Sequence, residues 1–534
     1  MKIALTGGRS LLGGVLAQAL ASEGGHEVTL VPEGDLRDEA FAQRAVRGAE
    51  TLIHLAPLYP DAVASEQDEI DQATRGTYVL LNAALEAGVK RIILGSTLDL
   101  FERYPAAWNV GETWQPLPDV RKTRELAVYL AEETVKQFAR VEPLLTFCLR
   151  FGEVVDELAI KGKSFDSRWL HVQDAVQAVR AALVATPGQR PPRVDGGEPQ
   201  SPRSGWWVFH IPGGGPARVP IANARAALEN GGLGYAPQHD LSGGKAGAFD
   251  DGAPDLAILG PQEHLHSRPI RKVVVFGAGG PLAAATSNAL AGAYTLRLTD
   301  VRAIAEIAAE GKPQSPGAPL PAPLDAPHEM RVVDVTQYDQ VRRACEGMDA
   351  IVNCTVVRPH PVNAFLVNLI GAYNVMRAAT EAGIRKVVHT GPLQVSNDRP
   401  AGYFWDFDVP DDAPGRPGIW LYGITKYLGQ EVVRLFAEQY DLLVPSLFYS
   451  IFANPETHAP RPGGVHPMTI SWEDAGLAMR RALEVAELPR PFEIFHILAD
   501  LPHGKYSNAK AKRLLGWQPR DSLAHLWAHR HPRD

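Results

Sequence analysis

The chain repeats one long series of motifs, and this repeat limits the folds that the sequence can adopt. Residues 1–14 read MKIALTGGRSLLGG, and residues 270–283 read IRKVVVFGAGGPLA; each is an apolar run, a glycine-rich turn and the start of a helix. A second pair follows, RGTYVLLNAALEAGVKRIILGST at 75–97 and IGAYNVMRAATEAGIRKVVHTGP at 370–392. A repeat on this scale indicates two copies of one supersecondary plan. We therefore predict two tandem α/β domains.

The length and composition agree with this prediction. The chain has 534 residues, whereas single hydrophobic cores stop growing near about 250–300 residues. A net charge of −8 without a Lys/Arg-rich stretch argues against a nucleic-acid partner. Three cysteines are too few for a disulfide framework, and the longest apolar stretch is too interrupted to span a membrane. A first strand beginning at Lys2 leaves no room for a signal peptide, so we expect a cytoplasmic protein with no membrane partner.

Within each half, apolar β-branched runs alternate with Ala/Leu/Glu-rich helical stretches. Strands that are apolar throughout are typical of parallel sheets covered on both faces. The sequence therefore predicts two Rossmann-type, doubly wound α/β domains. We place the first domain at 1–235 and the second at 270–534, joined by a turn-rich linker at 236–269.

The two copies differ in the spacing between the glycine-rich turn and the next predicted strand end that carries an aspartate. Gly7 and Asp35 are 28 residues apart, whereas Gly277 and Asp334 are 57 apart. The first copy is therefore predicted to lack about one helix and its flanking loops. This is the region that would border a bound adenosine.

The glycine-rich turn of the second half suits a dinucleotide. A pyrophosphate needs free backbone N–H groups at a helix N-terminus, with glycine where a Cβ would collide. Gly277, Gly279 and Gly280 supply this pattern, and Asp300 ends the following strand. An acidic residue there accepts the ribose hydroxyls and favours NAD over NADP.

The corresponding turn in the first half is less complete. Ser10 replaces the middle glycine, and the following strand breaks at Pro32 with no acidic residue at its end. Either Arg9 binds a phosphate here, or the turn survives only as architecture. A second cofactor site would use Gly7, Ser10, Gly13 and Asp35.

Tyr422 and Lys426 are the candidate catalytic residues. Four residues apart on a helix, they share one face, and a lysine ammonium near a phenol favours the phenolate by opposite charge. Such a tyrosine can move a hydroxyl proton while a nicotinamide exchanges hydride with the carbon. Tyr506 and Lys510 have the same spacing, which we interpret as a surface coincidence.

Both halves resemble the extended short-chain dehydrogenase/reductase (SDR) superfamily, the NAD-dependent epimerase/dehydratase group. The second half is similar to uronate dehydrogenase-like members through the segments VNLIGAYNVMRAA, LYGITK and YSNAKAKRLLGWQPRDS. The resemblance implies a small C-terminal substrate-binding lobe in each domain and NAD as cofactor in the second. It also implies roles for three residues: Asp334 beside the adenine, Tyr422 in proton transfer, and Lys426 at the nicotinamide ribose.

The chain also departs from the family pattern. The family tyrosine works with a Ser or Thr at the end of the fourth strand, where the second half has Pro392, with Thr390 and Ser396 as nearby substitutes. The first half has Thr97 at this position, but no Tyr-x-x-x-Lys motif occurs before residue 269. Each half therefore keeps only some of the Ser or Thr, Tyr and Lys residues that the family uses in catalysis.

The sequence indicates the substrate less clearly than it indicates the cofactor. The substrate-carboxylate arginine of uronate dehydrogenases falls near Gly464 here, so Arg461 and Arg358 are the alternative candidates for a carboxylate partner. No histidine or cysteine spacing indicates a metal site.

Two classes of function follow. The first is an NAD-dependent oxidoreductase acting on a sugar or sugar-acid hydroxyl, with the first domain as a scaffold that pairs with the second as in a dimer. The second is a dinucleotide-binding sensor without turnover; an NAD-dependent sugar epimerase is a further alternative.

Overall fold

A computed structural model divides the chain into two compact units, residues 1–257 and residues 258–534. The structure describes residues 1–22, 24–105, 108–186, 205–214, 222–226, 232–242, 269–396, 409–458 and 464–528. Of the linker predicted at 236–269, residues 243–268 lie outside the described residues. The domain boundaries therefore stay predictions.

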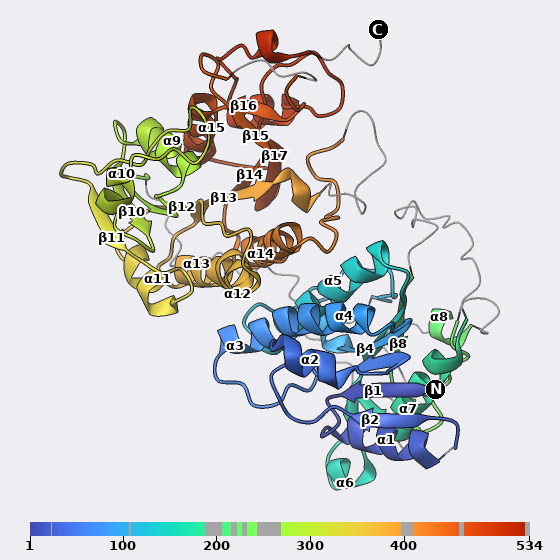
Figure 1. The fold of residues 1–534 in the computed structure, drawn as a ribbon. Helices are drawn as coiled ribbons and strands as arrows, with labels where there is room; N and C mark the ends of the chain where they lie inside the picture. Colours follow the sequence, from blue (N-terminus) through green and yellow to red (C-terminus); the bar gives the residue numbers. More distant parts are fainter. Residues whose placement is uncertain are drawn as a thin grey trace. The chain divides into compact units, whose positions relative to one another are not determined.

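The first unit is built around a parallel sheet. Over the described residues this sheet has six strands in the order β2-β1-β3-β4-β5-β8, all paired in parallel (Figure 1). The strands are β1 (Lys2–Thr6), β2 (Glu27–Leu30), β3 (Thr51–His54), β4 (Arg91–Thr97), β5 (Leu145–Phe151) and β8 (Trp206–Ile211), with β6 (Glu153–Val155) and β7 (Trp169–His171) as a separate pair. The helices are α1 (Leu11–Ser22), α2 (Glu39–Ala45), α3 (Glu66–Asp71), η1 (Gln72–Gly76), α4 (Thr77–Glu86), η2 (Leu98–Phe101), α5 (Thr123–Val141), α6 (Glu157–Ile160), α7 (Val172–Val184) and α8 (Ala222–Arg225).

The second unit repeats this plan with a larger sheet. Its described residues form seven parallel strands in the order β11-β10-β9-β12-β13-β14-β17 (Figure 1). The strands are β9 (Lys272–Phe276), β10 (Thr295–Asp300), β11 (Glu329–Val332), β12 (Ala350–Asn353), β13 (Lys386–Pro392), β14 (Val444–Tyr449) and β17 (Phe492–His496), with β15 (Ile451–Ala453) and β16 (Thr469–Ser471) as a separate pair. The helices are α9 (Pro281–Leu290), α10 (Ile304–Ala309), α11 (Tyr338–Cys345), α12 (Pro361–Phe365), η4 (Leu366–Ile370), α13 (Gly371–Glu381), η5 (Leu393–Val395), α14 (Leu421–Tyr440), α15 (Trp472–Glu484), α16 (Ala509–Leu515) and η6 (Ala524–Leu526).

Both sheets are doubly wound, which confirms the predicted fold class. In the first unit β2 and β3 lie on opposite sides of β1, and in the second unit β10 and β12 flank β9 in the same way. Strands β3 and β12 are buried at every position, as expected for parallel strands covered on both faces. Ligands of such sheets bind beyond the carboxyl ends of the strands where the strand order reverses. The glycine-rich turns after β1 and β9 lie at this place.

The units differ where the sequence predicts a loss. The second unit has α10 and β11 between β10 and α11, whereas the first passes from β2 to α2 without a helix or strand between. One prediction is wrong in detail: Asp35 does not follow a strand. It lies in a turn, because the strand that would correspond to β11 is the element that is missing.

A rare local structure appears in both units at the same place. The π-helical turns η1 and η4 directly precede α4 and α13. Such turns occur mostly as single interruptions of α-helices, often at functional sites. Their presence in both copies supports the duplication independently of the sequence.

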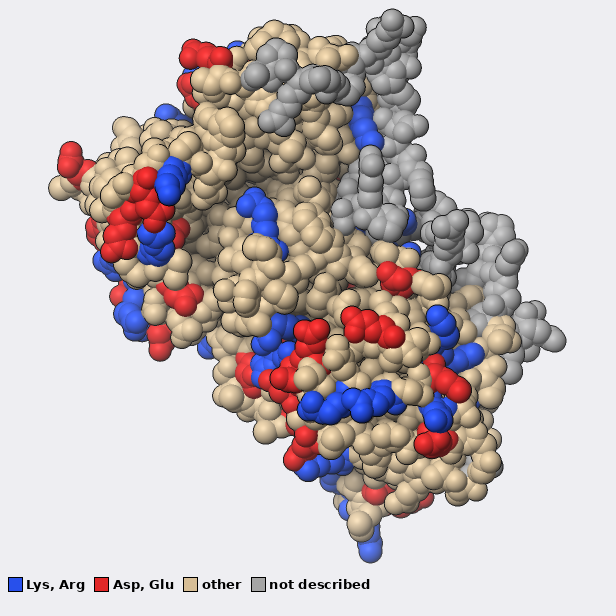
Figure 2. All heavy atoms as spheres, in the orientation of Figure 1, with Lys and Arg blue, Asp and Glu red and all other residues tan. Residues whose placement is uncertain are grey.

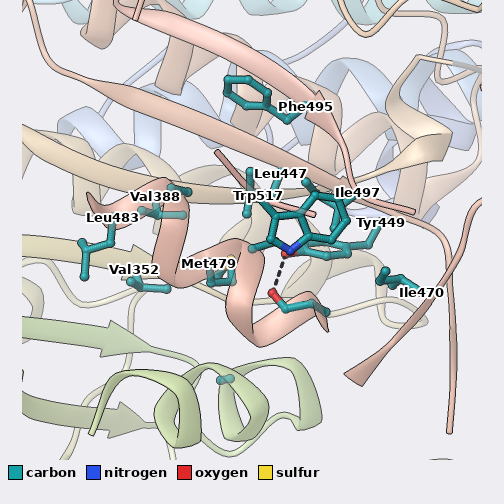
Figure 3. Packing of buried hydrophobic residues seen from close by; sticks show 14 of the residues in the cluster. Val352, Val388, Leu447, Tyr449, Ile470, Met479, Leu483, Phe495, Ile497 and Trp517 are labelled. Carbon is teal, nitrogen blue, oxygen red and sulfur yellow. Dashed lines mark hydrogen bonds between the residues drawn. The ribbon is translucent and has the colours of Figure 1, made fainter. Parts of the chain in front are cut away.

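The core of the second unit surrounds Trp517. Figure 3 shows its indole beside Tyr449, Leu447 and Ile497, so the chain after α16 packs on the sheet. The indole N–H donates to the backbone oxygen of Asp474 at 3.1 Å. This contact fixes the C-terminal segment to α15.

A buried aspartate holds the end of each unit. In the second unit Asp474 accepts the backbone N–H groups of Arg520 and Asp521, each at 2.9 Å. In the first, Asp174 accepts those of Gln238 and His239 at 2.9 and 3.1 Å. The first residues of the predicted linker are therefore bonded to the first unit.

Candidate active site

Helix α14 places Tyr422 and Lys426 one turn apart at its amino-terminal end. The helix begins at Leu421, directly after the extended residue Trp420. Residues four apart lie on the same helix face. Both side chains are buried, with 8% of Tyr422 and 4% of Lys426 exposed. The two residues that the sequence predicts to share a helix face therefore both lie where little water reaches them.

The Lys426 ammonium is directed to the loop that follows β12. Its Nζ lies 3.5 Å from the backbone oxygen of Thr355. Burial lowers the pKa of Lys426 to about 8; the nearby Cys354 thiol acts against this shift, and the Arg358 charge adds to it. Burial raises the pKa of Cys354 itself to about 12, so the thiol is neutral. Lys426 therefore supplies a positive charge at neutral pH.

The Tyr422 ring contacts Trp420 and Arg358. The Trp420 ring meets it edge-on, with 5.4 Å between centroids, and the guanidinium carbon of Arg358 lies 5.1 Å from its centroid. Burial raises the pKa of the Tyr422 phenol, and Arg358 opposes the rise through its charge and a hydrogen bond. The sequence predicts that the Lys426 ammonium lowers this pKa, and the structure adds the Arg358 charge as a second cation beside the phenol.

Among the described residues, neither predicted substitute takes the place of a hydroxyl at Pro392, the end of β13. Pro392 is buried and pairs with Tyr449 of β14. Thr390 donates its hydroxyl proton to the backbone oxygen of Asn353 at 2.9 Å, and Ser396 donates to that of Leu393 at 3.2 Å. Both predicted substitutes therefore use their protons on the backbone.

The glycine-rich turn after β9 has the shape that a pyrophosphate needs. Gly277 has φ +76°, and a Cβ there would lie 3.0 Å from the Thr355 backbone. The Gly279 N–H donates to the Asp300 carboxylate at 2.9 Å. Gly280 caps α9 without any side-chain hydrogen bond. Pro281, the first residue of α9, has no N–H, so the N–H groups of Leu282 and Ala283 are the ones that the helix start leaves for an anion.

Asp334, predicted to lie beside an adenine, follows β11 by two residues. Its carboxylate accepts the backbone N–H of Thr336 at 2.9 Å, and its own N–H donates to the Gln340 side chain at the same distance. These bonds fix the turn and leave one carboxylate oxygen for another donor. The residues of the second unit therefore fit a dinucleotide.

The first unit closes the corresponding helix end. Ser10 donates its hydroxyl proton to the Gly7 oxygen at 2.8 Å and accepts the Gly13 N–H at 3.0 Å. Its side chain thus occupies an amide at the start of α1, where the second unit leaves α9 open. Gly7 keeps the left-handed conformation, with φ +71°. The turn is preserved in shape, but its anion-binding amides are not all free.

The aspartate of the possible second cofactor site is already paired. Asp35 accepts Nε of Arg37 at 2.7 Å, and the same guanidinium binds Asp68 at 2.7 Å and Asp71 at 3.0 Å. Arg9, the alternative phosphate ligand, forms an ion pair with Glu33. The side chains of Asp35 and Arg9 are therefore already engaged within the first unit.

The first unit also lacks the candidate catalytic pair. Aligning Tyr129 of α5 with Tyr427 of α14 brings the buried positions of the two helices into step. Arg124 and Val128 then take the places of the tyrosine and the lysine. Arg124 forms an ion pair with Glu69. No proton-transfer group is present at this position.

Two further expectations concern Tyr506 with Lys510, and Arg461. Tyr506 lies before α16, so it shares no helix face with Lys510, and its side chain is buried beside Met468 rather than on the surface. Lys510 instead forms an ion pair with Glu493 at 2.6 Å. Arg461, a candidate carboxylate partner, lies outside the described residues.

Comparisons with known protein families give a separate match in each of the two units. The NAD dependent epimerase/dehydratase family model matches residues 273–475. The 3-beta hydroxysteroid dehydrogenase/isomerase family model matches residues 17–159. Both families belong to the extended SDR superfamily, so each unit contains a segment that matches it. The predicted resemblance is confirmed for both halves.

Related proteins of known activity are sugar dehydrogenases. The chain is 25% identical to the NAD-dependent glucose-6-phosphate dehydrogenase of Haloferax volcanii over 49% of the chain and 98% of the relative. It is 25% identical to the uronate dehydrogenase of Pseudomonas syringae pv. tomato over 41% and 72%. The crystal structure of uronate dehydrogenase from Agrobacterium tumefaciens shares 21% identity, covers 47% of this chain and 85% of that chain, and has a TM-score of 0.38.

The surface charges and composition of the two units do not narrow the class of protein further. Lys and Arg are interspersed with Asp and Glu on the face shown in Figure 2. Within the described part of the chain, no helix has the length and apolar character needed to cross a membrane. The same residues contain no cluster of three His, Cys, Asp or Glu side chains suited to a metal ion.

Sequence reasoning missed two contacts in the second SDR unit. Arg358 was considered for a substrate carboxylate, and its contact with Tyr422 was not foreseen. Asn368 was not singled out, yet it joins the loop after β12 to α14, donating to the Thr425 hydroxyl at 3.0 Å. A polar residue inside the otherwise apolar run FLVNLIGAY is the signal that could have marked it.

Proposed function

We propose that the second unit is an NAD-dependent oxidoreductase that acts on a hydroxyl of a sugar or sugar acid. The observation that carries this proposal is the buried Tyr422–Lys426 pair in a fold whose glycine-rich turn leaves the start of α9 open. The named activities of the sugar dehydrogenase relatives point in the same direction.

NAD, when bound, supplies the acceptor for the hydride. The turn at Gly277, Gly279 and Gly280 would hold its pyrophosphate, since the amides of α9 are uncapped. The Asp300 carboxylate would accept ribose hydroxyls, and Asp334 would lie beside the adenine. Lys426 would hold the nicotinamide ribose through its ammonium.

Tyr422 is the group that moves the proton. In the oxidation direction its phenolate oxygen accepts the proton of the substrate hydroxyl as the carbon loses hydride. Positive charge near the phenol favours this phenolate. Burial excludes water, so each charge near the phenol acts in a medium of lower dielectric than bulk solvent.

The first unit is proposed to be a pseudo-enzyme scaffold. It lacks the tyrosine and lysine, and the side chains of Ser10 and Arg37 occupy the groups that a dinucleotide would use. As the family resemblance implies, we propose that it pairs with the second unit through α4, α5, α13 and α14, in place of a second subunit. Cross-linking of the intact chain tests this pairing: links between α5 and α14 within one chain support it, and links confined to other surfaces contradict it.

A panel of aldoses, sugar phosphates and uronic acids tests the proposed activity. Each compound is incubated with the full chain and NAD, and NADH formation is followed by absorbance. Turnover of at least one sugar or sugar acid is expected, and the product identifies the oxidised carbon. Binding of NAD without turnover of any compound contradicts the proposal.

Pro392 favours a second candidate, a sensor that binds NAD without using it. A proline cannot donate the hydrogen bond that the family hydroxyl gives to the reacting oxygen. Tight NAD binding with no turnover in the same panel is the result expected for a sensor. Interconversion of two sugars without net NADH formation would identify the third alternative, an epimerase.

A further inference from the structure

The reacting oxygen in the second unit lacks one of its usual partners. Pro392 has no hydroxyl, and the hydroxyl protons of Thr390 and Ser396 are donated to backbone oxygens. Tyr422 would therefore face the substrate without a strand-end hydroxyl beside it. A positive charge beside the phenol would restore part of this missing support.

Arg358 places a positive charge beside this phenol. Its guanidinium carbon is 5.1 Å from the centroid of the Tyr422 ring. The side chain is otherwise exposed, although the phenol that it contacts is buried. The guanidinium therefore borders the site from the solvent side.

The backbone next to Arg358 is fixed from the helix that carries Tyr422. The Asn368 amide accepts the Val357 N–H at 3.0 Å and donates to the Val357 oxygen at 2.7 Å. The same amide donates to the Thr425 hydroxyl of α14 at 3.0 Å. One side chain in the π-helical turn η4 thus ties the residue before Arg358 to α14. The position of Arg358 relative to Tyr422 is set by this link and not by a free loop.

We propose that Arg358 is a positioning residue that acts through Tyr422. Its guanidinium packs against the phenol ring, and its charge favours the phenolate in a site where Pro392 supplies no hydroxyl. This inference rests on the proposed oxidoreductase function. In the reaction, the O–H bond of the substrate breaks and its proton passes to the Tyr422 oxygen. The C–H bond breaks with transfer of hydride to NAD, and a C=O bond forms. Arg358 keeps its charge throughout and exchanges no proton, because a guanidinium stays protonated in proteins.

Several titratable groups lie near the Tyr422–Lys426 pair. Arg358 approaches the phenol from the loop after β12, and the neutral Cys354 thiol and the buried His389 of β13 lie near Lys426. The charge of Arg358 favours the phenolate form of Tyr422. Removal of Arg358 is therefore expected to raise the pKa of the phenol and to leave the protonation of the thiol unchanged.

The test compares Arg358→Met and Arg358→Lys with the matched control Arg343→Met. Arg343 is an exposed arginine of the same unit, in the last turn of α11. The first readout is the pH titration of tyrosinate absorbance, taken as the difference between each protein and the same protein carrying Tyr422→Phe. The second is the pH profile of kcat/KM with the best substrate of the panel.

Arg358→Met is expected to shift the Tyr422 titration and the rising limb of kcat/KM upward by about one pH unit. At neutral pH the rate should fall about tenfold, while NAD affinity stays unchanged. Arg358→Lys should recover part of the shift, and Arg343→Met should leave both curves in place.

Two results would overturn the inference. An unchanged Tyr422 titration in Arg358→Met would show that the guanidinium does not act on the phenol. A rise in KM alone, with kcat and the pH profile unchanged, would show that Arg358 binds the substrate instead. The titration needs no substrate, so it stays decisive even if the chain turns over no sugar and the proposed function fails.

Discussion

Thr97 and Pro392 occupy the same position in the two sheets. Thr97 ends β4 opposite Phe151 of β5, and Pro392 ends β13 opposite Tyr449 of β14. The Thr97 hydroxyl accepts the Asp99 N–H at 3.1 Å, which caps η2, and Pro392 begins η5 without a side-chain cap. The first unit keeps the hydroxyl but lacks the tyrosine and the lysine. The second unit keeps the tyrosine and the lysine but lacks the hydroxyl.

Pro392→Ser should restore the missing hydroxyl to the second unit. The extended backbone of Pro392 (φ −86°, ψ 153°) is accessible to serine, and the new side chain can cap η5 as Thr97 caps η2. We expect kcat to rise about tenfold or more, since a positioned proton-transfer partner contributes on the order of 10²–10⁴ in rate. Steady-state kinetics with the best substrate measures this. Pro392→Ala is the control without a hydroxyl, and an equal gain in both variants would contradict the account.

The chain should bind one NAD, in the second unit. Gly277→Ala should abolish this binding, because alanine at φ +76° is strained and its Cβ would approach the Thr355 backbone. Gly7→Ala carries a matched strain at φ +71° in the first unit and should leave NAD affinity unchanged. Isothermal titration calorimetry gives the stoichiometry and affinity of each protein. Two bound NAD molecules per chain would contradict the assignment of the first unit as a scaffold.

Asp300 should set the preference for NAD over NADP. Its carboxylate would accept ribose hydroxyls and repel a 2′-phosphate, so Asp300→Asn should reduce the ratio of kcat/KM for NAD to that for NADP. We expect at least about a tenfold change, which corresponds to about 1.4 kcal/mol. Asparagine can still accept the Gly279 N–H, so the turn should keep its shape. An unchanged ratio of kcat/KM for the two cofactors, with normal NAD affinity, would show that Asp300 does not bind the ribose hydroxyls.

Lys386 should make the stability of the second unit depend on pH. Its Nζ donates to the Ala482 oxygen at 3.4 Å and to that of Val485, and burial lowers its pKa to about 7. The unfolded chain, with a lysine pKa of about 10.4, binds more protons than the folded chain between these values. The free energy of unfolding is therefore highest above the unfolded pKa and falls as the pH is lowered from there towards about 7. The slope is at most about 1.4 kcal/mol per pH unit.

Urea unfolding at several pH values measures this dependence. The variant Lys386→Met should show a flatter pH dependence than the unmodified chain over this interval. Lys272→Met removes an exposed lysine from β9 and serves as the control, with the pH dependence retained. Parallel curves for all three proteins would refute the account of Lys386.

The sequence was sufficient to predict the architecture, because that depends on patterns local in the chain. Apolar runs such as those of β3 and β12 predict buried parallel strands, and the glycine-rich turns predict the strand–turn–helix units that follow β1 and β9. The missing element of the first unit was also visible from the spacing. Asp35 was assigned to a strand end incorrectly, since nothing near it in sequence shows that its strand is absent.

The site could be predicted only in part. Tyr422 and Lys426 share a helix face by their spacing alone, so their pairing was predictable. The contact between Arg358 and Tyr422 joins residues 64 positions apart, and it depends on how Asn368 fixes the loop after β12. Likewise, only the three-dimensional structure shows that Ser10 caps its own helix and that Arg37 binds Asp35, Asp68 and Asp71.

Replacing Tyr422 by phenylalanine tests the central claim most directly. Tyr422→Phe removes one hydroxyl and leaves the glycine-rich turn intact, and Tyr506→Phe removes a hydroxyl from another buried tyrosine of the same unit as a control. In Tyr422→Phe, NADH formation should fall by about 10²–10⁴-fold while NAD affinity stays the same; Tyr506→Phe should retain turnover. Full turnover in Tyr422→Phe would contradict the assignment of proton transfer to this residue.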